Sequence, residues 1–461
     1  MTITVNASNL IDYDTEVQRL LDIYSATNIP IEISFKELLP QLNKADRVTH
    51  LIHTYPAKLL MHIPFFFLNN NIFSKKGDLI LDPFCGSGTV ILEAILAGRR
   101  GFGADANPLA RIISKVKTFR FDIELLRIYS QQVYVKMEQL TGAPKPFVCN
   151  IDYWFLPQVQ NSLSIIAKAI DDISNPNYRD FFLVCFSNCV KKVSLADPRV
   201  TVPVKLRLEQ YSESHPLYNT TKRKLENVKN INVYAKFKEI VEANVNRAEN
   251  FNLFNSYNFC GEIISNDARS LNNNDTREKT DIALESINLI ITSPPYAGAQ
   301  KYIRSSSLNL GWLNFIGDSN TLKDLENKNI GREHYPKDRY KYFTPTNISS
   351  ADILLKEIFN VNPLRALIAG NYLIEMREAF RESIKHLKPG GYFVLVAANN
   401  VVCKKEFKTQ EYLMEIMEEL NMKVILRLID DIKSYGLMTK RNKTANIITR
   451  EWVLVFQKPI N

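Results

Sequence analysis

Long apolar runs and targeting signals are missing from this sequence of 461 residues, and each absence excludes a class of protein. The most hydrophobic run, Ile63–Leu68, is far shorter than the about 20 residues that a membrane-spanning helix needs. The first residues, MTITVNASNLIDYD, are polar and acidic and lack the apolar core of a signal peptide. We therefore expect neither a membrane protein nor a secreted one, and predict a cytoplasmic location.

Cysteine and histidine are also scarce. The six cysteines are too few for a disulfide framework, and no two of them form the C-x-x-C pair of a structural zinc site. The six histidines show no H-x-x-x-H or H-E pattern of the kind that ligates a catalytic metal. The sequence therefore predicts a protein of a reducing compartment without a bound metal.

Charge of one sign is in modest excess. The chain carries 58 Lys and Arg against 49 Asp and Glu, which gives a formal net charge of +9. Within residues 191–238 there are 11 basic and 4 acidic side chains, so much of the excess is local. A basic segment of this kind indicates contact with a polyanion, with a solvated helix face as the alternative.

The hydrophobic pattern predicts an α/β fold with a largely helical basic insertion. A short apolar strand over 78–84, a glycine loop, a helix over 89–97 and a strand over 101–104 form the opening of a doubly wound sheet. Further strands are expected at 262–265, 287–292, 392–397, 423–428 and 452–456, and helices at 14–25, 35–43, 123–139, 159–172 and 365–387. We expect four regions, namely an N-terminal helical segment 1–45, a cofactor-binding part 46–118, the insertion 119–255 and a catalytic part 256–461.

The glycine loop follows the first predicted strand. Gly86 and Gly88 allow close approach of the backbone to a ligand at a helix N-terminus. No Gly-Lys-Ser/Thr follows, which excludes a P-loop, and Ile91 stands where a dinucleotide fingerprint has its third glycine. Asp105 ends the next strand, where a ribose diol would need an acceptor. The pattern favours an adenosine-containing cofactor with a positive amino group over a purely structural turn.

A second motif, Ser293-Pro294-Pro295-Tyr296, follows the apolar strand 287–292. Two prolines cannot continue a central strand, so they predict a rigid loop at the carboxyl edge of the sheet. A serine hydroxyl, exposed carbonyls and an aromatic ring suit an exocyclic amino group on a planar base. A strand exit with a packed tyrosine is the structural alternative.

Together these motifs resemble the S-adenosylmethionine-dependent DNA amino-methyltransferases, which methylate cytosine N4 or adenine N6. The similarity covers HTYPAKL (53–59), LDPFCGSGTVILEAILAGRRGFGADANPLA (81–110), SNDARSL (265–271), TSPPYAGAQKYIRSSSLNLGWL (292–313), LKPGGYFVLVAANN (387–400) and EWVLVFQK (451–458). The resemblance implies a Rossmann-like methyltransferase sheet, S-adenosylmethionine as cofactor and double-stranded DNA as substrate.

The resemblance also implies roles for individual residues. The cofactor is expected to contact Tyr55, Asp82, Phe84, Cys85, Gly86, Ser87, Gly88, Thr89, Asp105, Ala106, Asp267 and Ala268. Among these, Asp105 takes the ribose hydroxyls and Asp267 the adenine amino group. Cys85 is expected to pack in the loop, because carbon-5 cytosine enzymes carry their nucleophile in a separate Pro-Cys motif.

The catalytic residues implied are Ser293, Pro294, Pro295 and Tyr296, which would hold a base that has been flipped out of the duplex. Hydrogen bonds from the amino group to Ser293 and to the Pro294 carbonyl would expose the nitrogen lone pair for in-line attack on the methyl group. Serine at the first position is commoner in cytosine-N4 enzymes, whereas Asp or Asn is typical of adenine-N6 enzymes. We therefore expect cytosine N4, with adenine N6 as the alternative.

DNA contacts are expected from basic residues, namely Lys191, Lys192, Lys222, Arg223, Lys224, Lys440 and Arg441. The family also predicts a restriction-modification system, with a cognate restriction endonuclease as a possible partner. Two alternatives are an RNA or tRNA base methyltransferase and a non-catalytic DNA-binding relic. The serine of the tetrad argues against the first, and the complete set of motif residues argues against the second.

Overall fold

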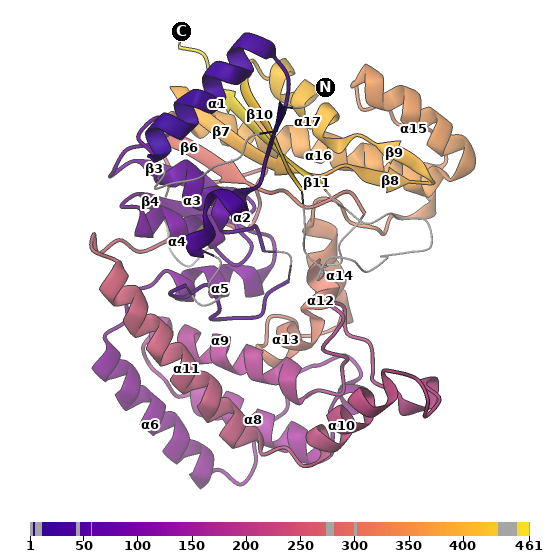
Figure 1. Cartoon of the computed structure of the whole chain (residues 1–461). Coiled ribbons are helices and arrows are strands. Elements are labelled where there is room, and N and C mark those ends of the chain that lie inside the picture. The colour runs from indigo at the N-terminus through magenta and orange to yellow at the C-terminus, as the bar shows by residue number, and fades with distance from the viewer. Residues whose placement is uncertain are drawn as a thin grey trace.

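A nine-stranded, mostly parallel sheet forms the upper part of the molecule, and a layer of helices lies below one end of it (Figure 1). The computed structural model describes residues 3–4, 12–42, 47–56, 58–272, 281–298, 302–431 and 450–460. The strand order is β1-β2-β10-β11-β7-β6-β3-β4-β5. The strands are β1 (Ile3–Thr4), β2 (Ile31–Ile33), β3 (Leu79–Asp82), β4 (Arg100–Ala104), β5 (Glu262–Ser265), β6 (Ile287–Thr292), β7 (Leu387–Ala397), β10 (Lys423–Asp431) and β11 (Arg450–Gln457).

Strand β11 runs antiparallel to both of its neighbours, β10 and β7, whereas the other strand pairs in the described part of this sheet are parallel. The predicted α/β fold is confirmed. A separate hairpin is formed by β8 (Asn400–Val402) and β9 (Lys405–Phe407).

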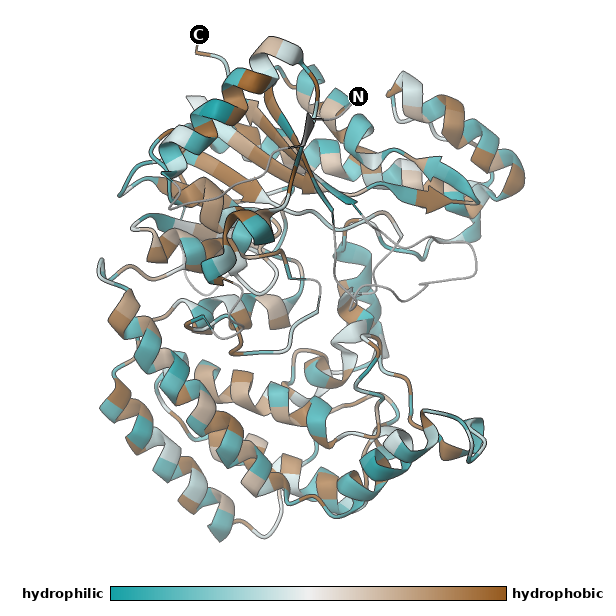
Figure 2. Ribbon diagram, in the orientation of Figure 1, coloured by the Kyte–Doolittle hydropathy of each residue, from teal (hydrophilic) through white to brown (hydrophobic). Residues whose placement is uncertain are grey.

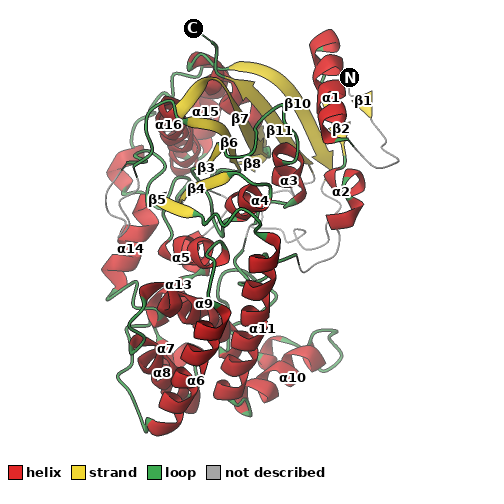
Figure 3. Ribbon diagram, turned by 90° about the vertical axis from the view of Figure 1, so that its left-hand side faces the viewer, coloured by secondary structure: helices red, strands yellow, loops and turns green. Residues whose placement is uncertain are grey.

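Helices cover both faces of the sheet, as Figure 3 shows in side view. One face packs on α1 (Tyr13–Thr27), α2 (Phe35–Leu38), α3 (His62–Leu68) and α4 (Thr89–Leu96), and the other on α15 (Ser349–Val361), α16 (Pro363–His386) and α17 (Thr409–Glu419). Successive strand residues alternate between these layers. In β7, Phe393 and Leu395 join one core, and Val394 and Val396 join the other. Burial on both faces explains why the central strands are continuous apolar runs.

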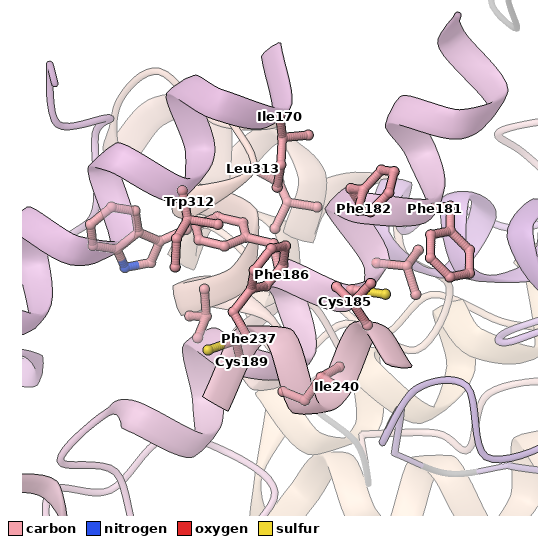
Figure 4. Close-up of a cluster of buried hydrophobic side chains, with 14 of the residues drawn as sticks. Ile170, Phe181, Phe182, Cys185, Phe186, Cys189, Phe237, Ile240, Trp312 and Leu313 are labelled. Atoms are coloured by element: carbon pink, nitrogen blue, oxygen red, sulfur yellow. The ribbon is translucent and has the colours of Figure 1, made fainter. Parts of the chain in front are cut away.

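The helical layer has a hydrophobic core of its own. It contains α5 (Pro108–Lys117), α6 (Ile123–Gln139), α7 (Ile151–Trp154), α8 (Pro157–Asp171), α9 (Pro176–Val193), α11 (Val233–Phe254) and α13 (Ser307–Trp312). Figure 4 shows part of this core, where Phe186 of α9 lies beside Trp312 of α13, and Phe181 and Phe182 of α9 belong to the same cluster. Further helices are α10 (Tyr218–Lys229), α12 (Tyr302–Ser305) and α14 (Ser319–Lys328), with 3₁₀ turns at Pro40–Leu42, Leu208–Gln210 and Lys337–Tyr340. Within the described ranges, no helix is long and apolar enough to cross a bilayer.

Two local predictions need correction. The helix expected over 35–43 ends as α2 at Leu38, because Pro40 has no N–H to continue the helical hydrogen bonds. The strand expected over 392–397 is longer, because β7 begins at Leu387, and its register against β6 shifts between Ile287 and Leu289. Gly390, with φ of +76°, accommodates this irregularity.

Candidate active site

A cleft opens at the carboxyl ends of four adjacent parallel strands, β6, β3, β4 and β5. Crevices at this edge of an open sheet are the usual ligand sites of α/β folds. The empty volume of the cleft is about 630 Å³. Its walls are formed by Tyr55, Pro83, Phe84, Gly86, Asp105, Ala106, Asp267, Ala268, Ser293, Pro295, Tyr302, Lys328, Asn329 and Ile330.

The structure therefore brings together most of the residues that the sequence singles out. The predicted cofactor residues on the cleft wall are Tyr55, Phe84, Gly86, Asp105, Ala106, Asp267 and Ala268, and the predicted catalytic residues there are Ser293 and Pro295. Seven predicted residues are not among the wall residues. Asp82, Cys85, Ser87, Gly88, Thr89 and Pro294 are buried, and Tyr296 is half-buried and follows the wall residue Pro295 in the chain.

Asp82 connects the glycine loop to the strand that carries the Ser-Pro-Pro-Tyr tetrad. Its Oδ1 accepts hydrogen bonds from the Phe84 N–H at 3.1 Å and from the Thr292 hydroxyl at 2.7 Å. Thr292 is the last residue of β6, directly before Ser293. Burial raises the pKa of Asp82 to about 7, partly offset by these two hydrogen bonds. The carboxyl group thus fixes the loop and the tetrad relative to each other.

Asp105 and Gly86 form one side of the cleft. The two carboxylate oxygens of Asp105 accept hydrogen bonds from the backbone N–H groups of Gly86, at 2.9 Å, and Asn107, at 2.8 Å. Gly86 has a φ of +51°, and a Cβ there would stand 3.9 Å from the Tyr55 ring. Burial raises the pKa of Asp105, with the backbone hydrogen bonds acting in the opposite direction. The loop backbone, a carboxylate and an aromatic ring therefore enclose one cradle.

Gly88 and Cys85 pack against neighbouring elements and do not line the cleft. Gly88 has a φ of +75°, and an added Cβ would clash with the Ser114 Oγ of α5, so only glycine fits. Cys85 is buried against Gly103 of β4, and burial raises the pKa of its thiol well above the ordinary value. A protonated, buried thiol is a poor nucleophile, which supports the packing role expected for Cys85.

The helical layer holds the segment that carries Tyr55. Asn188 of α9 accepts hydrogen bonds from the Thr54 N–H at 3.2 Å and the Thr54 hydroxyl at 3.1 Å, and donates to the Ile52 carbonyl at 2.9 Å. Asn244 of α11 donates to the same carbonyl at 3.0 Å. The Tyr55 hydroxyl accepts from the Asn107 amide at 3.1 Å. One wall of the cleft thus depends on a side chain 134 residues away in the sequence.

Asp267 lines the cleft but is already engaged by a neighbour. Its oxygens accept hydrogen bonds from the guanidinium of Arg269 at 2.8 to 3.2 Å. Arg269 also pairs with Glu375 of α16, at 3.3 Å, and Arg332 lies 2.5 Å from the same Glu375 oxygen. This network was not predicted from the sequence, because α16 is distant along the chain and its acidic residues form no motif.

Five further wall residues were not singled out from the sequence, namely Pro83, Tyr302, Lys328, Asn329 and Ile330. Pro83 and Tyr302 lie within the segments that resemble the methyltransferase family, so this resemblance could have identified them as candidate site residues. Lys328 ends α14, and Asn329 and Ile330 follow it in an irregular, mixed-charge stretch, so only the tertiary fold brings these three residues to the cleft.

The tetrad loop is fixed on several sides. The Asn400 amide donates to the Ala297 carbonyl at 2.9 Å, and the Gly298 N–H donates to the Gly331 carbonyl at 3.2 Å. The Tyr296 hydroxyl donates to Oε1 of Glu451, on β11, at 3.2 Å. These contacts support the rigid loop that the two prolines predict.

The predicted DNA-binding residues fall into three groups. Lys192, Lys222 and Arg223 are exposed, the latter two on α10 at the edge of the helical layer, where Figure 2 shows a largely hydrophilic helix. Lys191 is half-buried, and the Nζ of Lys224 donates to the Lys192 carbonyl at 3.0 Å. Lys440 and Arg441 lie outside the described residues.

The raised pKa of Asp82 predicts that the stability of the fold depends on pH. Between about pH 4 and 7 the native carboxyl is protonated while the unfolded one is ionised, so the native state binds more protons and its stability falls as the pH rises. Asp82→Asn keeps a side-chain oxygen but cannot ionise, so we expect a shallower decline, by up to about 1.4 kcal/mol per pH unit. Denaturant unfolding of both proteins at pH 5, 6 and 7 measures this, and identical slopes would contradict the assignment.

Comparison with known proteins agrees with the motifs. A family model for N6/N4 DNA methylases matches residues 69–115, from the end of α3 into α5. The type II methyltransferase M.MvaI of Kocuria varians is 25% identical over 447 residues, which cover 90% of this chain and 92% of that protein. The type II methyltransferase M.BsoBI of Geobacillus stearothermophilus is 24% identical over 449 residues, covering 84% and 81%.

Among solved structures, a SAM-dependent methyltransferase of Methanosarcina mazei covers 84% of this chain and 96% of its own, with 10% identity and a TM-score of 0.29.

Proposed function

Because this chain belongs to the N6/N4 DNA methylase family, we propose that it methylates cytosine N4 in double-stranded DNA. The coarser activity follows from the family: the protein is a DNA amino-methyltransferase that uses S-adenosylmethionine. The observation that carries the proposed methyl transfer is that Ser293 and Pro295 line the same cleft as Asp105 and Asp267, whereas the cytosine assignment rests on the serine at the first position of the tetrad. Residues that could bind the target base and residues that could bind the adenosine of the cofactor thus line the same cleft.

The residues of the cleft fit this cofactor. Carboxylates of Asp105 and Asp267 can accept from ribose hydroxyls and an adenine amino group, and the Gly86 backbone leaves room beside the Tyr55 ring. When bound, the cofactor supplies an electrophilic methyl group on a positively charged sulfur. The buried Asp82 carboxyl underneath the loop makes the local field favourable for a cation once that carboxyl is ionised.

The tetrad would orient the amino nitrogen that receives the methyl group. The Ser293 hydroxyl and the Pro294 carbonyl can accept the two N–H groups of an exocyclic amine, which favours a pyramidal nitrogen whose lone pair is no longer delocalised into the ring. The hydrogen bond between Thr292 and Asp82 holds this pair of acceptors at a fixed place relative to the glycine loop. A serine hydroxyl at the first position, in place of Asp or Asn, favours cytosine over adenine by resemblance to the family.

We further propose that residues 119–255 recognise the DNA target, that 46–118 and 256–461 form the catalytic domain, and that 1–45 is an N-terminal helical segment. The excess of basic residues within 191–238 supports DNA contact by the helical layer. Both type II relatives span most of this chain, which supports a place in a type II restriction-modification system beside a cognate endonuclease.

The exposed charges of α10 give a test of DNA contact. Replacing Lys222 and Arg223 by alanine should weaken binding to all duplex sequences alike and reduce the slope of log K against log salt by about 0.9 for each phosphate that the variant no longer neutralises. Lys75→Ala with Lys76→Ala, exposed residues of equal charge before β3, is the matched control. Salt titrations of DNA binding measure these slopes. If the α10 variant and the control both had the wild-type slope, α10 would be only a solvated face.

The substrate class is tested by methyl transfer from labelled S-adenosylmethionine to duplex DNA, to the same sequence as single strands, and to RNA. We expect label in duplex DNA and almost none when Ser293 is replaced by alanine. Transfer to RNA alone would overturn the proposal and favour an RNA methyltransferase.

A further inference from the structure

The antiparallel strand β11 brings an acidic residue to the catalytic edge of the sheet. The parallel strands place their last residues at this edge, but β11 places its first residues there, and Trp452 pairs with Ala397 at the end of β7. Glu451 therefore lies one strand beyond β7 from the tetrad loop, which follows β6. Tyr296 reaches across this distance, and its hydroxyl donates to the Glu451 carboxylate at 3.2 Å.

Glu451 occupies an unfavourable place for an acidic residue. It pairs in register with the buried Asp430 of β10, so two carboxyl groups lie side by side on one face of the sheet. Arg450, its neighbour in the chain, forms ion pairs with Asp431 and Glu32 instead. Burial raises the pKa of Glu451, and the hydrogen bond from Tyr296 acts in the opposite direction. Burying a carboxylate is costly unless a donor compensates, and the tyrosine hydroxyl is such a donor.

The backbone of the tetrad loop has other supports. The Ala297 carbonyl accepts a hydrogen bond from the Asn400 amide, and the Gly298 N–H donates one to the Gly331 carbonyl. Neither hydrogen bond depends on Glu451. What Glu451 holds is the far end of the Tyr296 ring. A ring tethered at its hydroxyl has less rotational freedom before the substrate arrives, which lowers the entropic cost of stacking on a base.

We propose that Glu451 is a positioning residue that fixes the Tyr296 ring for contact with the target base. The proposal rests on the proposed function, because it assumes that Tyr296 contacts the base that is methylated. It applies equally to a cytosine and to an adenine.

A double-mutant cycle tests the proposal. Tyr296→Phe removes the hydroxyl but keeps the ring, and Glu451→Leu removes the acceptor. We expect each to lower kcat for DNA methylation by about tenfold or more, with an unchanged Kd for S-adenosylmethionine, and the double variant to be no worse than the poorer single variant. Glu451→Gln keeps an acceptor oxygen and should recover most of the activity. Reductions that multiply in the double variant, or full activity of Tyr296→Phe beside an impaired Glu451→Leu, would overturn the proposal.

Thermal unfolding of the same proteins without DNA separates this proposal from the proposed function. If Glu451 holds Tyr296, the two substitutions should lower Tm by less in combination than the sum of their separate effects. A wild-type protein that methylates no DNA would contradict the proposed function, whatever the Tm values show. Additive Tm shifts would contradict the contact, and with it the role of Glu451, even in an active enzyme.

Discussion

Ser293→Ala is expected to lower the rate of methyl transfer by about 10²-fold or more, the usual cost of removing one preorganised hydrogen-bonding group from an active site. The structure places Ser293 on the cleft wall, directly after the Thr292 that is bonded to Asp82. Because the proposed partner of the Ser293 hydroxyl is the base and not the cofactor, the affinity for S-adenosylmethionine should change little. Single-turnover kinetics on duplex DNA and calorimetry of cofactor binding measure the two effects separately.

Ser293→Asn is the matched control, since its amide oxygen restores an acceptor at the same position. We expect it to retain more activity than Ser293→Ala. Equal rates for wild type and Ser293→Ala would show that the tetrad serine does not contact the amino group. A weaker cofactor affinity with an unchanged rate would place Ser293 in the cofactor site instead.

Asp105→Ala is expected to weaken S-adenosylmethionine binding by about 1.5–3 kcal/mol, the range for a hydrogen bond to a charged group. The substitution also removes the acceptor for the Gly86 and Asn107 N–H groups, so part of the effect will come from a less ordered loop. Asp105→Asn keeps an oxygen for one of these donors and should bind the cofactor with intermediate affinity.

Calorimetry with the cofactor alone measures the affinities of these variants, and circular dichroism checks that they are folded. A folded Asp105→Ala protein with wild-type affinity would show that the ribose assignment is wrong. If Asp105→Ala weakened the binding of DNA in the absence of cofactor as much as it weakened the binding of S-adenosylmethionine, the substitution would have disturbed the fold in general.

Local sequence signals predicted the part of the site that is contiguous in the chain. The strand, loop and helix from Leu79 to Leu96 follow from an apolar run, two glycines and helical spacing. Parallel strands share one edge, so the residues after β3, β4, β5 and β6 converge there once the fold class is known. Asp105 and Ser293, which follow predicted strands, and Asp267, which the resemblance to the family implies, therefore line one cleft.

Other features depend on tertiary contacts that no local pattern records. Helix α9 is buried on most sides, so its apolar residues show no clear amphipathic period, and its length could not be predicted. The contact of Tyr296 with Glu451 joins residues 155 positions apart. Likewise, Lys224 belongs to a basic cluster by sequence, yet its Nζ is bonded to the Lys192 carbonyl, which sets it apart from the exposed Lys222 and Arg223.

Identifying the methylated base is the most direct test of the proposed cytosine-N4 activity. Duplex DNA of mixed sequence is incubated with the protein and S-adenosylmethionine, digested to nucleosides and analysed by mass spectrometry, with Ser293→Ala as the control. We expect N4-methylcytosine in the wild-type reaction and its near absence in the control. N6-methyladenine as the sole modified nucleoside would contradict the cytosine assignment, and no modified nucleoside at all would contradict the activity.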